Sequence, residues 1–178
     1  MAEVYNIKVT ELRSYCPKLK IGDKVLLTGT VYTARDAAHK RFDALMNEGK
    51  QLPVEIRDAV IYYAGPTPTP QNLPIGSCGP TTSSRMDPYS PYLYDLGVVA
   101  TIGKGERNKA VIDSIIKNKG VYLCAIGGAG ALAALSITDC QVIAFEDLGC
   151  ESIKKLTFNE FPLIVGIDCN GNNIFNKD

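Results

Sequence analysis

The second half of the chain alternates between strand-like and helix-like segments. Short apolar runs bounded by glycine predict strands, and apolar residues at helical spacing predict helices between them. The order is strand 96–103, helix 106–118, strand 121–128, helix 130–137 and strand 141–146. This βαβ alternation is typical of a parallel sheet, and it makes an α/β fold the prediction.

The first part of the chain predicts β structure followed by one helix. Residues 4 to 31 alternate in polarity around a Gly22–Asp23 turn, as strands do. A helix is then predicted from about Ala34 to Glu48. Thr33 and Asp36 have the spacing of a helix cap, and Gly49 is suited to end the helix. A last strand and a hairpin-like turn near Asn170–Asn172 are expected in segment 162–175.

Length and charge limit the class of protein. The 178 residues suit one domain, 1–178, with a substantial core. Nineteen basic and nineteen acidic residues cancel, so no overall field would attract nucleic acid or an anionic membrane. An anion site must therefore come from a local arrangement, and neither nucleic acid nor a membrane is expected as a partner.

The cysteines and the apolar runs indicate the compartment. The six cysteines are scattered without a CxxC pair, and MAEVYNIKVT lacks the apolar run of a secretory signal. The longest apolar stretch, near 121–135, is interrupted by glycines and is shorter than the ~20 residues that span a bilayer. We expect a cytoplasmic protein without a membrane segment.

The first candidate constellation is RDAAHKR, residues 35–41, where a strand is predicted to lead into a helix. Arg35 lies near the helix start, where the helix dipole makes a cation unfavourable. An arginine fork beside free helix amides would instead form a receptor for a carboxylate. The alternative is a surface arginine paired with Asp36 or Asp43. His39 shares the helical face of Arg35, and a structural role suits a lone histidine as well as catalysis does.

The second constellation is GPTTSSRMD, residues 79–87, which follows a proline-rich segment at 66–74. Thr81 and Arg85 would share a face if Pro80 began a helical turn. The hydroxyls and amides there, including Thr82, could bind an oxyanion while Arg85 held a carboxylate. The alternative is a helix cap with a solvent-facing arginine. Cys78 could be a nucleophile, although a small buried cysteine is the commoner reading.

The third constellation is TIGKGERNKAV, residues 101–111, a strand that runs into Gly103–Lys104–Gly105 ahead of a helix. Such a turn can bind anions, although the Walker pattern is absent. Lys104 could reach a ligand carboxylate, or it could be an ordinary surface lysine. The glycines of GGAGAL, from Gly127, give a weaker signal, because they can equally serve helix–sheet packing.

Together, three loops that follow strands each present a cation beside amides or hydroxyls. A small dianionic carboxylic acid would suit such a pocket. No metal-ligand spacing, nucleotide loop or acid–base pair accompanies the cations. The sequence therefore predicts half of an active site and no metal ligand in this chain.

Several of these motifs resemble those of one known family, both in their residues and in their order along the chain. TGTVYTARDAAHKR, YYAGPTP, GSCGPTTSSRMDPYSP and the later GKG are similar to the β subunit, or C-terminal domain, of class I iron–sulfur fumarate hydratases and L(+)-tartrate dehydratases. The resemblance covers almost the whole chain. It implies a swivelling β/β/α three-layer domain with a central parallel sheet and a β-rich N-terminal part.

The resemblance also implies a function and a partner. The expected activity is reversible hydration of fumarate to malate, or dehydration of tartrate, by a hetero-oligomer. The partner α subunit would carry a [4Fe–4S] cluster, and this chain would ligate no metal. Arg35, Arg85 and Lys104 would bind the substrate carboxylates and Thr81 would take part in proton transfer. His39, Thr82, Gly103 and Gly105 would support them. A non-catalytic dicarboxylate-binding or assembly module remains the alternative from another class.

Overall fold

The structure is a computed structural model that describes residues 1–125 and 130–176. These residues form a mixed α/β fold around one sheet. Its elements are β1 (Val4–Lys8), η1 (Val9–Glu11), α1 (Leu12–Tyr15), β2 (Lys24–Thr33), α2 (Asp36–Asn47), β3 (Val60–Tyr62), η2 (Ser83–Met86), α3 (Ser90–Leu96), β4 (Ala100–Gly103), α4 (Lys109–Asn118), β5 (Val121–Cys124), α5 (Gly130–Ala134), β6 (Ile137–Ala144), η3 (Glu146–Glu151) and β7 (Ile153–Ile167).

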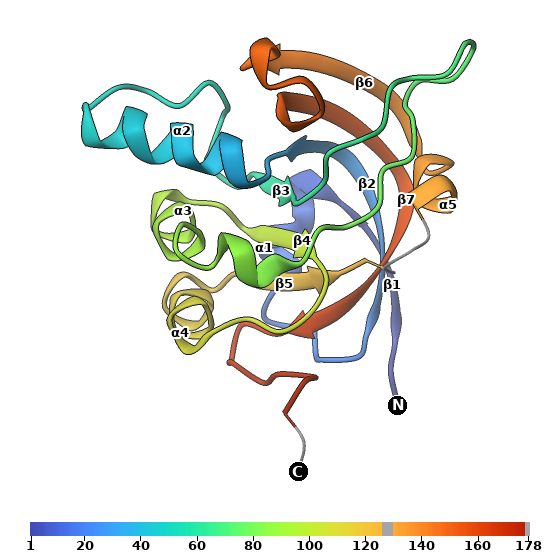
Figure 1. The fold of residues 1–178 in the computed structure, drawn as a ribbon. Helices are drawn as coiled ribbons and strands as arrows, with labels where there is room; N and C mark the ends of the chain where they lie inside the picture. The colour runs from blue at the N-terminus through green and yellow to red at the C-terminus, as the bar shows by residue number, and fades with distance from the viewer. Residues whose placement is uncertain (126–129, 177–178) are drawn as a thin grey trace.

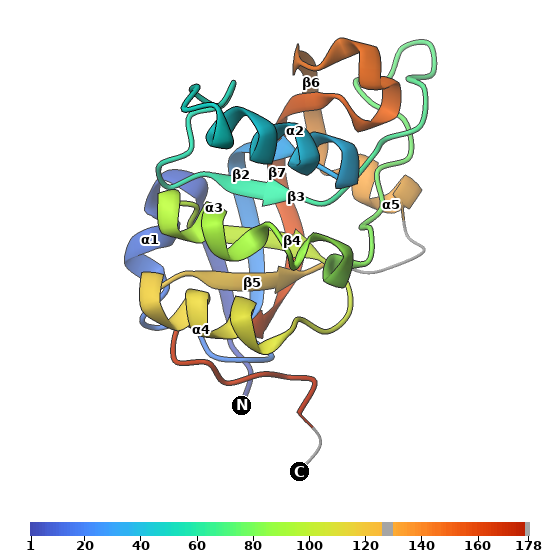
Figure 2. The ribbon, with the colours of Figure 1, turned by 60° about the vertical axis from the view of Figure 1, so that its left-hand side comes forward.

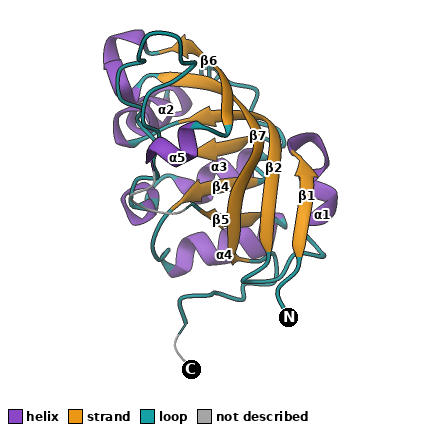
Figure 3. Cartoon of the chain, turned by 90° about the vertical axis from the view of Figure 1, so that its right-hand side faces the viewer, coloured by secondary structure: helices purple, strands orange, loops and turns teal. Residues whose placement is uncertain are grey.

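The sheet closes on itself. Its strand order is β1-β2-β3-β4-β5-β7-β6, and β2 also pairs with β7. The neighbours from β1 to β5 are parallel, whereas β7 runs antiparallel to β2, β5 and β6. Strands β2, β3, β4, β5 and β7 therefore form a closed path, with β1 and β6 attached beside it (Figures 1 and 3).

The parallel prediction holds for β4 and β5 but is wrong for the strand expected at 141–146. That segment belongs to β6, which begins at Ile137 and pairs antiparallel with β7. Only the short η3 segment separates β6 from β7, and a connection this short suits an antiparallel pair, because a parallel crossover needs a dozen or more residues. The glycine-rich stretch predicted to join strand 121–128 to helix 130–137 falls mainly on residues 126–129, outside the described part of the chain.

Two apolar clusters fill the space on the two faces of the strands. One lies within the closed path and includes Leu27, Phe158 and Phe161, whose two phenyl rings stack with centroids 4.1 Å apart. The other lies between the strands and the helices α2, α3 and α4, with Phe42 and Ile115 among its members. These three helices gather on one side of the sheet (Figure 2). No helix in the described ranges could cross a membrane.

Helix α2 agrees closely with the predicted helix, but its start differs in detail. Arg35 occupies the N-cap position, and its own side chain makes no capping hydrogen bond. Thr33 is therefore not the cap, because its hydroxyl accepts a 3.0 Å hydrogen bond from the amide of Lys154 instead. Gly49, at a φ of 69°, follows the helix end as expected.

Candidate functional site

Three parallel strands deliver the candidate residues to one edge of the sheet. Arg35 follows β2, Gly65 follows β3 and Lys104 follows β4. Backbone pairing continues to this edge, since the amide of Ala34 bonds to Tyr62 O at 3.0 Å and that of Tyr63 to Ile102 O at 2.8 Å. Carboxyl ends of parallel strands meet at the same edge, where ligands of α/β folds commonly bind.

Thr81 and Lys104 are brought together by the backbone. The Lys104 amide bonds to Thr81 O at 3.4 Å, the Ser83 amide bonds to Lys104 O at 2.9 Å, and Thr82 and Lys104 form a parallel bridge. Segment 81–83 thus extends the sheet. The prediction of a helical turn beginning at Pro80 is wrong. The amides of Thr81 and Ser83 bond to neighbouring extended segments, and the helical turn η2 begins only at Ser83.

Arg35 is held tightly at its main chain and loosely at its guanidinium. Its carbonyl accepts hydrogen bonds from His39 N at 2.9 Å and from His39 Nδ1 at 2.8 Å. The side chain passes Gly65, where an added Cβ would lie 2.9 Å from Arg35 Nη1. Any larger residue there would displace the guanidinium. Arg35 Nε is buried without a hydrogen-bond partner among the described residues.

Two carboxylates flank Arg35. Asp36 Oδ2 and Glu151 Oε1 each lie 4.0 Å from Arg35 Nε, too far for a hydrogen bond. Glu151 Oε1 also accepts a 3.3 Å hydrogen bond from the amide of Ala37 in the first turn of α2. The N-terminus of this helix therefore binds a carboxylate of the chain itself, whereas the sequence predicts a ligand carboxylate there.

Arg85 joins Arg35 through Asp36. Arg85 lies on η2, and its Nε donates a 3.0 Å hydrogen bond to Asp36 Oδ1. The Arg85 side chain is 52% exposed. Two arginines that are far apart in sequence thus share one carboxylate. The predicted alternative partner of Arg35, Asp36, is present, but it does not form a direct hydrogen bond with Arg35.

Glycines shape the loop that carries Lys104. Gly105 has a φ of 83°, a conformation that residues with a Cβ rarely adopt. A Cβ on Gly103 would overlap the hydroxyl of Ser83, so the close contact between the two segments requires glycine. Helix α4 starts at Lys109, after the Asn108 cap, and so Lys104 is farther from a helix start than the sequence predicts.

His39 is a buried neutral side chain. Burial lowers its pKa to about 4, and the Tyr63 and Tyr89 rings lie 5.5 and 5.6 Å from its own ring. Because its Nδ1 faces a carbonyl oxygen, Nδ1 carries the proton and donates to Arg35 O. This contact agrees with the supporting role expected for His39, and its burial removes it from direct proton transfer at the surface.

A buried ion pair that the sequence did not reveal lies beneath the site. Arg107 is completely buried at its side chain, and its Nε donates to Asp87 Oδ1 at 2.7 Å. Its other nitrogens bond to Thr101, Ser90 and the Tyr63 hydroxyl. The network joins β3 and β4 to the segment that follows η2. Sequence alone gave no signal for it, because Arg107 and Asp87 resemble ordinary surface charges in their local context.

The cysteines do not form a reactive or metal-binding group in the described structure. Cys78 is buried, and burial raises its pKa to about 12, which disfavours the thiolate a nucleophile would need. Among residues 1–125 and 130–176, no three His, Cys, Asp or Glu side chains gather closely enough to hold a metal ion. The structure therefore favours Cys78 as a buried core residue over Cys78 as a nucleophile.

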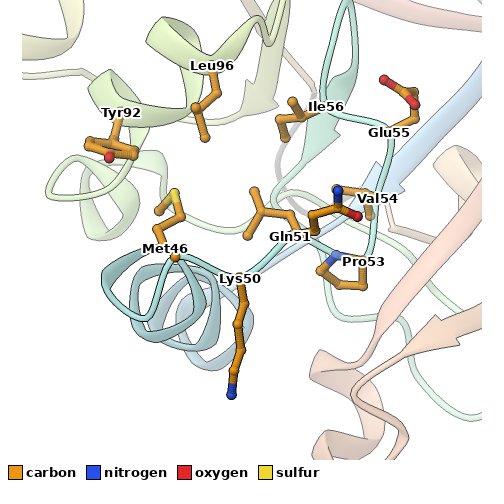
Figure 4. Close-up of a pocket in the computed structure, with 11 residues that line it drawn as sticks. Met46, Lys50, Gln51, Pro53, Val54, Glu55, Ile56, Tyr92 and Leu96 are labelled. Carbon is orange, nitrogen blue, oxygen red and sulfur yellow. The ribbon is translucent and has the colours of Figure 1, made fainter.

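One groove of the described structure lies away from these cations. It has a volume of about 810 Å³, and both apolar and polar side chains from the end of α2, the following loop and α3 line it, including Met46, Gln51, Ile56 and Tyr92 (Figure 4). None of Arg35, Arg85, Lys104 and Thr81 lines it. The Arg35 and Arg85 side chains are 23% and 52% exposed at the edge of the sheet.

Comparison with known proteins gives a consistent result. Residues 2–178 match the family model described as Fumarase C-terminus. The chain is 38% identical over 174 residues to "Fumarate hydratase class I, anaerobic" of Escherichia coli and 37% identical over 171 residues to "Fumarate hydratase 2" of Leishmania major. These alignments cover 97% and 95% of the chain but only 32% and 30% of the two relatives, so the chain spans about a third of their length.

A third relative is close to this chain in length. The chain is 37% identical over 166 residues to a protein of Methanocaldococcus jannaschii that is provisionally named L(+)-tartrate dehydratase subunit beta. That alignment covers 90% of the chain and 85% of the relative. The match therefore extends over most of both proteins.

Proposed function

Because the chain belongs to the Fumarase C-terminus family, we propose that it is the β subunit of a two-subunit hydro-lyase that hydrates fumarate to malate reversibly. The meeting of Arg35 and Arg85 at Asp36, together with the backbone hydrogen bond between Thr81 and Lys104, is the observation that carries the proposal. Three cations at one open edge suit a dianion. The assignment as a separate β subunit is supported by the Methanocaldococcus relative.

The proposed roles follow from the chemistry of each side chain. Arg35 and Arg85 bind the substrate carboxylates, because a planar guanidinium can donate two parallel charge-assisted hydrogen bonds. Lys104, exposed on its glycine loop, adds a point charge that can adjust to the ligand. Fixing both ends of a dicarboxylate orients its central carbons, which lowers the entropic part of the barrier.

Thr81 is the proposed proton-transfer residue. It lies between Tyr63 and Lys104 in the extended segment, with its amide bonded to Tyr63 O at 2.7 Å. An alcohol is a weak base, so the neighbouring cation and amides would have to stabilise its deprotonated form. Thr82, Gly103 and Gly105 support this arrangement through the bridge and the loop conformation described above.

The metal centre is proposed to belong to the partner. The described residues offer no group of three metal ligands, and so the protein ligands of a [4Fe–4S] cluster would come from an α subunit. When bound, a cluster with one open iron would supply a Lewis acid for the substrate hydroxyl. We also place the protein in the cytoplasm, in keeping with its scattered cysteines, and treat residues 1–178 as one swivelling β/β/α three-layer domain.

Co-expression with an α-type partner under anaerobic conditions tests the proposal. The reconstituted complex should hydrate fumarate, and the chain alone should not. Robust hydration by the isolated chain would overturn the subunit role. Tartrate is assayed in parallel, because the relatives include both names and both substrates are four-carbon dicarboxylates.

A second candidate is a non-catalytic dicarboxylate-binding or assembly module. The open cation cluster favours it, since binding alone needs no acid–base group. Titration calorimetry separates the two functions. A stand-alone binder should hold fumarate or tartrate at micromolar concentration, whereas half of a split site should bind either of them weakly.

A further inference from the structure

Asp36 contacts both proposed substrate arginines, although the resemblance assigns it no role. We propose that Asp36 is a positioning residue that presents Arg35 and Arg85 as a matched pair. The inference rests on the proposed function for its substrate. The evidence for positioning comes from the contacts of the two Asp36 oxygens with Arg85 and Arg35.

The first contact fixes Arg85 by one side of its guanidinium. Asp36 Oδ1 accepts from Arg85 Nε at 3.0 Å, and no hydrogen bond joins the Arg85 Nη atoms to the residues that the structure describes. A guanidinium offers five N–H donors in a rigid plane. Holding the Nε side therefore leaves the Nη edge directed away from Asp36, where it can donate to a ligand carboxylate.

The second contact is preformed but open. Asp36 Oδ2 and Arg35 Nε face each other at 4.0 Å, and both atoms are buried without a hydrogen-bond partner in the described ranges. Buried polar atoms without partners cost free energy. A closure of about 1 Å would satisfy both of them. Asp36 Oδ1 thus binds Arg85, and Asp36 Oδ2 lies beside Arg35 without yet bonding to it.

Charge alone predicts the opposite effect of removing Asp36. The cluster has three cations (Arg35, Arg85, Lys104) and two carboxylates (Asp36, Glu151), a formal sum of +1, which becomes +2 without Asp36. A dianion would be attracted more strongly by the +2 cluster. Weaker substrate binding after the removal of Asp36 would therefore point to the loss of positioning and not to the change in charge.

The experiment measures the complex with its partner in three single variants. Asp36→Ala should lower kcat/KM by roughly tenfold or more, as for the loss of a charge-assisted hydrogen bond, with most of the loss in KM. Asp36→Asn keeps an acceptor oxygen, so its kcat/KM should fall less than that of Asp36→Ala. Asp43→Asn, which removes a carboxylate from the same helix away from the site, should have the activity of the wild type. An unchanged or lower KM in Asp36→Ala would overturn the proposal.

A double-mutant cycle and an NMR measurement complete the test. In an Arg85→Met background, Asp36→Ala should cost clearly less than in the wild type, because coupled residues are not additive; full additivity would argue against a shared role. The Arg85 Nε–H signal of the ¹⁵N-labelled chain should be protected from exchange in the wild type and lose protection in Asp36→Ala and, less so, in Asp36→Asn. Equal protection in all three would overturn the proposal, even if the wild-type complex lacked hydratase activity and the proposed function failed.

Discussion

Asp87 Oδ1 accepts a 2.7 Å hydrogen bond from Arg107 Nε, and the two side chains are 6% and 0% exposed. Asp87 Oδ2 also accepts from the amide of Asn108, the residue that caps α4. The pair therefore joins the segment after η2 to the start of α4. These two segments flank the loop that carries Lys104. The buried ion pair therefore helps to hold the site in place.

Asp87→Asn should destabilise the fold, because it leaves the Arg107 charge buried without its partner. Breaking such a pair costs about 3–5 kcal/mol. Urea unfolding followed by circular dichroism would measure the change. The matched control is Asp113→Asn, whose partner Lys109 is 86% exposed and which should change stability by less than about 1 kcal/mol. Similar midpoints for Asp87→Asn and the wild type would contradict the structural role.

Arg35→Lys should lower kcat/KM by about 30-fold or more in the reconstituted enzyme. A lysine cannot reproduce the two parallel hydrogen bonds of a guanidinium, and a buried carboxylate left poorly paired costs about 2–5 kcal/mol. Steady-state kinetics with fumarate and tartrate provide the measurement. Arg41→Lys serves as the control, because Arg41 pairs with Asp147 at the surface. Wild-type efficiency of Arg35→Lys toward both substrates would refute the carboxylate-binding role.

Thr81→Ala should lower kcat by at least about 100-fold while changing KM little, as expected for the loss of a proton-transfer group. Thr81→Ser keeps the hydroxyl and should retain much of the activity. The comparison of the two variants separates the hydroxyl from the shape of the side chain. If the alanine variant turns over at the wild-type rate, another residue transfers the proton.

His39 should titrate far below an ordinary histidine. Burial lowers its pKa from 6.5 to about 4, so between these values the unfolded chain binds a proton that the folded chain does not. The His39 contribution to stability, about 3 kcal/mol, is present above pH 6.5 and is lost progressively as the pH falls to about 4. Because His39 is the single histidine, its ring signal in proton NMR reports the pKa directly. A midpoint near 6.5 would show that the ring is exposed.

Cys78→Ser should leave unchanged the spectrum of the iron–sulfur cluster that we propose for the partner. Cys78 is buried, and its carbonyl accepts a hydrogen bond from the Tyr62 hydroxyl, a contact that serine would keep. Electron paramagnetic resonance and visible absorption of the reconstituted complex would check this. Cys150→Ser is a matched exposed control with the same expected outcome. Loss of the cluster in Cys78→Ser would place a ligand in this chain.

The sequence predicted the elements near the site well because their signals are local. The α2 helix and the Gly103–Gly105 loop follow from periodicity and from glycine positions over a few residues. Thr81 failed as a helical position because its backbone bonds reach Tyr63 and Lys104, which are distant in sequence. Propensity cannot show such pairings.

The contacts between the site residues were harder to predict from the sequence than the identity of those residues. Arg35, Arg85 and Lys104 were chosen for their charge and context, but the sharing of Asp36 and the approach of Glu151 depend on the packing of η2 and η3 against α2. The role of Gly65 also becomes visible only when Arg35 passes it. Glu151 ends η3 and Gly65 follows β3, so no short window of sequence contains the arrangement.

The closed path of strands also has a consequence for folding kinetics. Its closing strand, β7, follows the other four members in the chain, and it pairs with β2 at positions such as Gly29 and Phe158, near opposite ends of the sequence. Contacts this distant form slowly, because the intervening chain must first be ordered. Glu151 reaches the start of α2 just ahead of β7, so the charge environment of Arg35 is completed only when that strand docks. During synthesis on the ribosome, the growing chain should therefore not complete the surroundings of Arg35 until β7 has emerged.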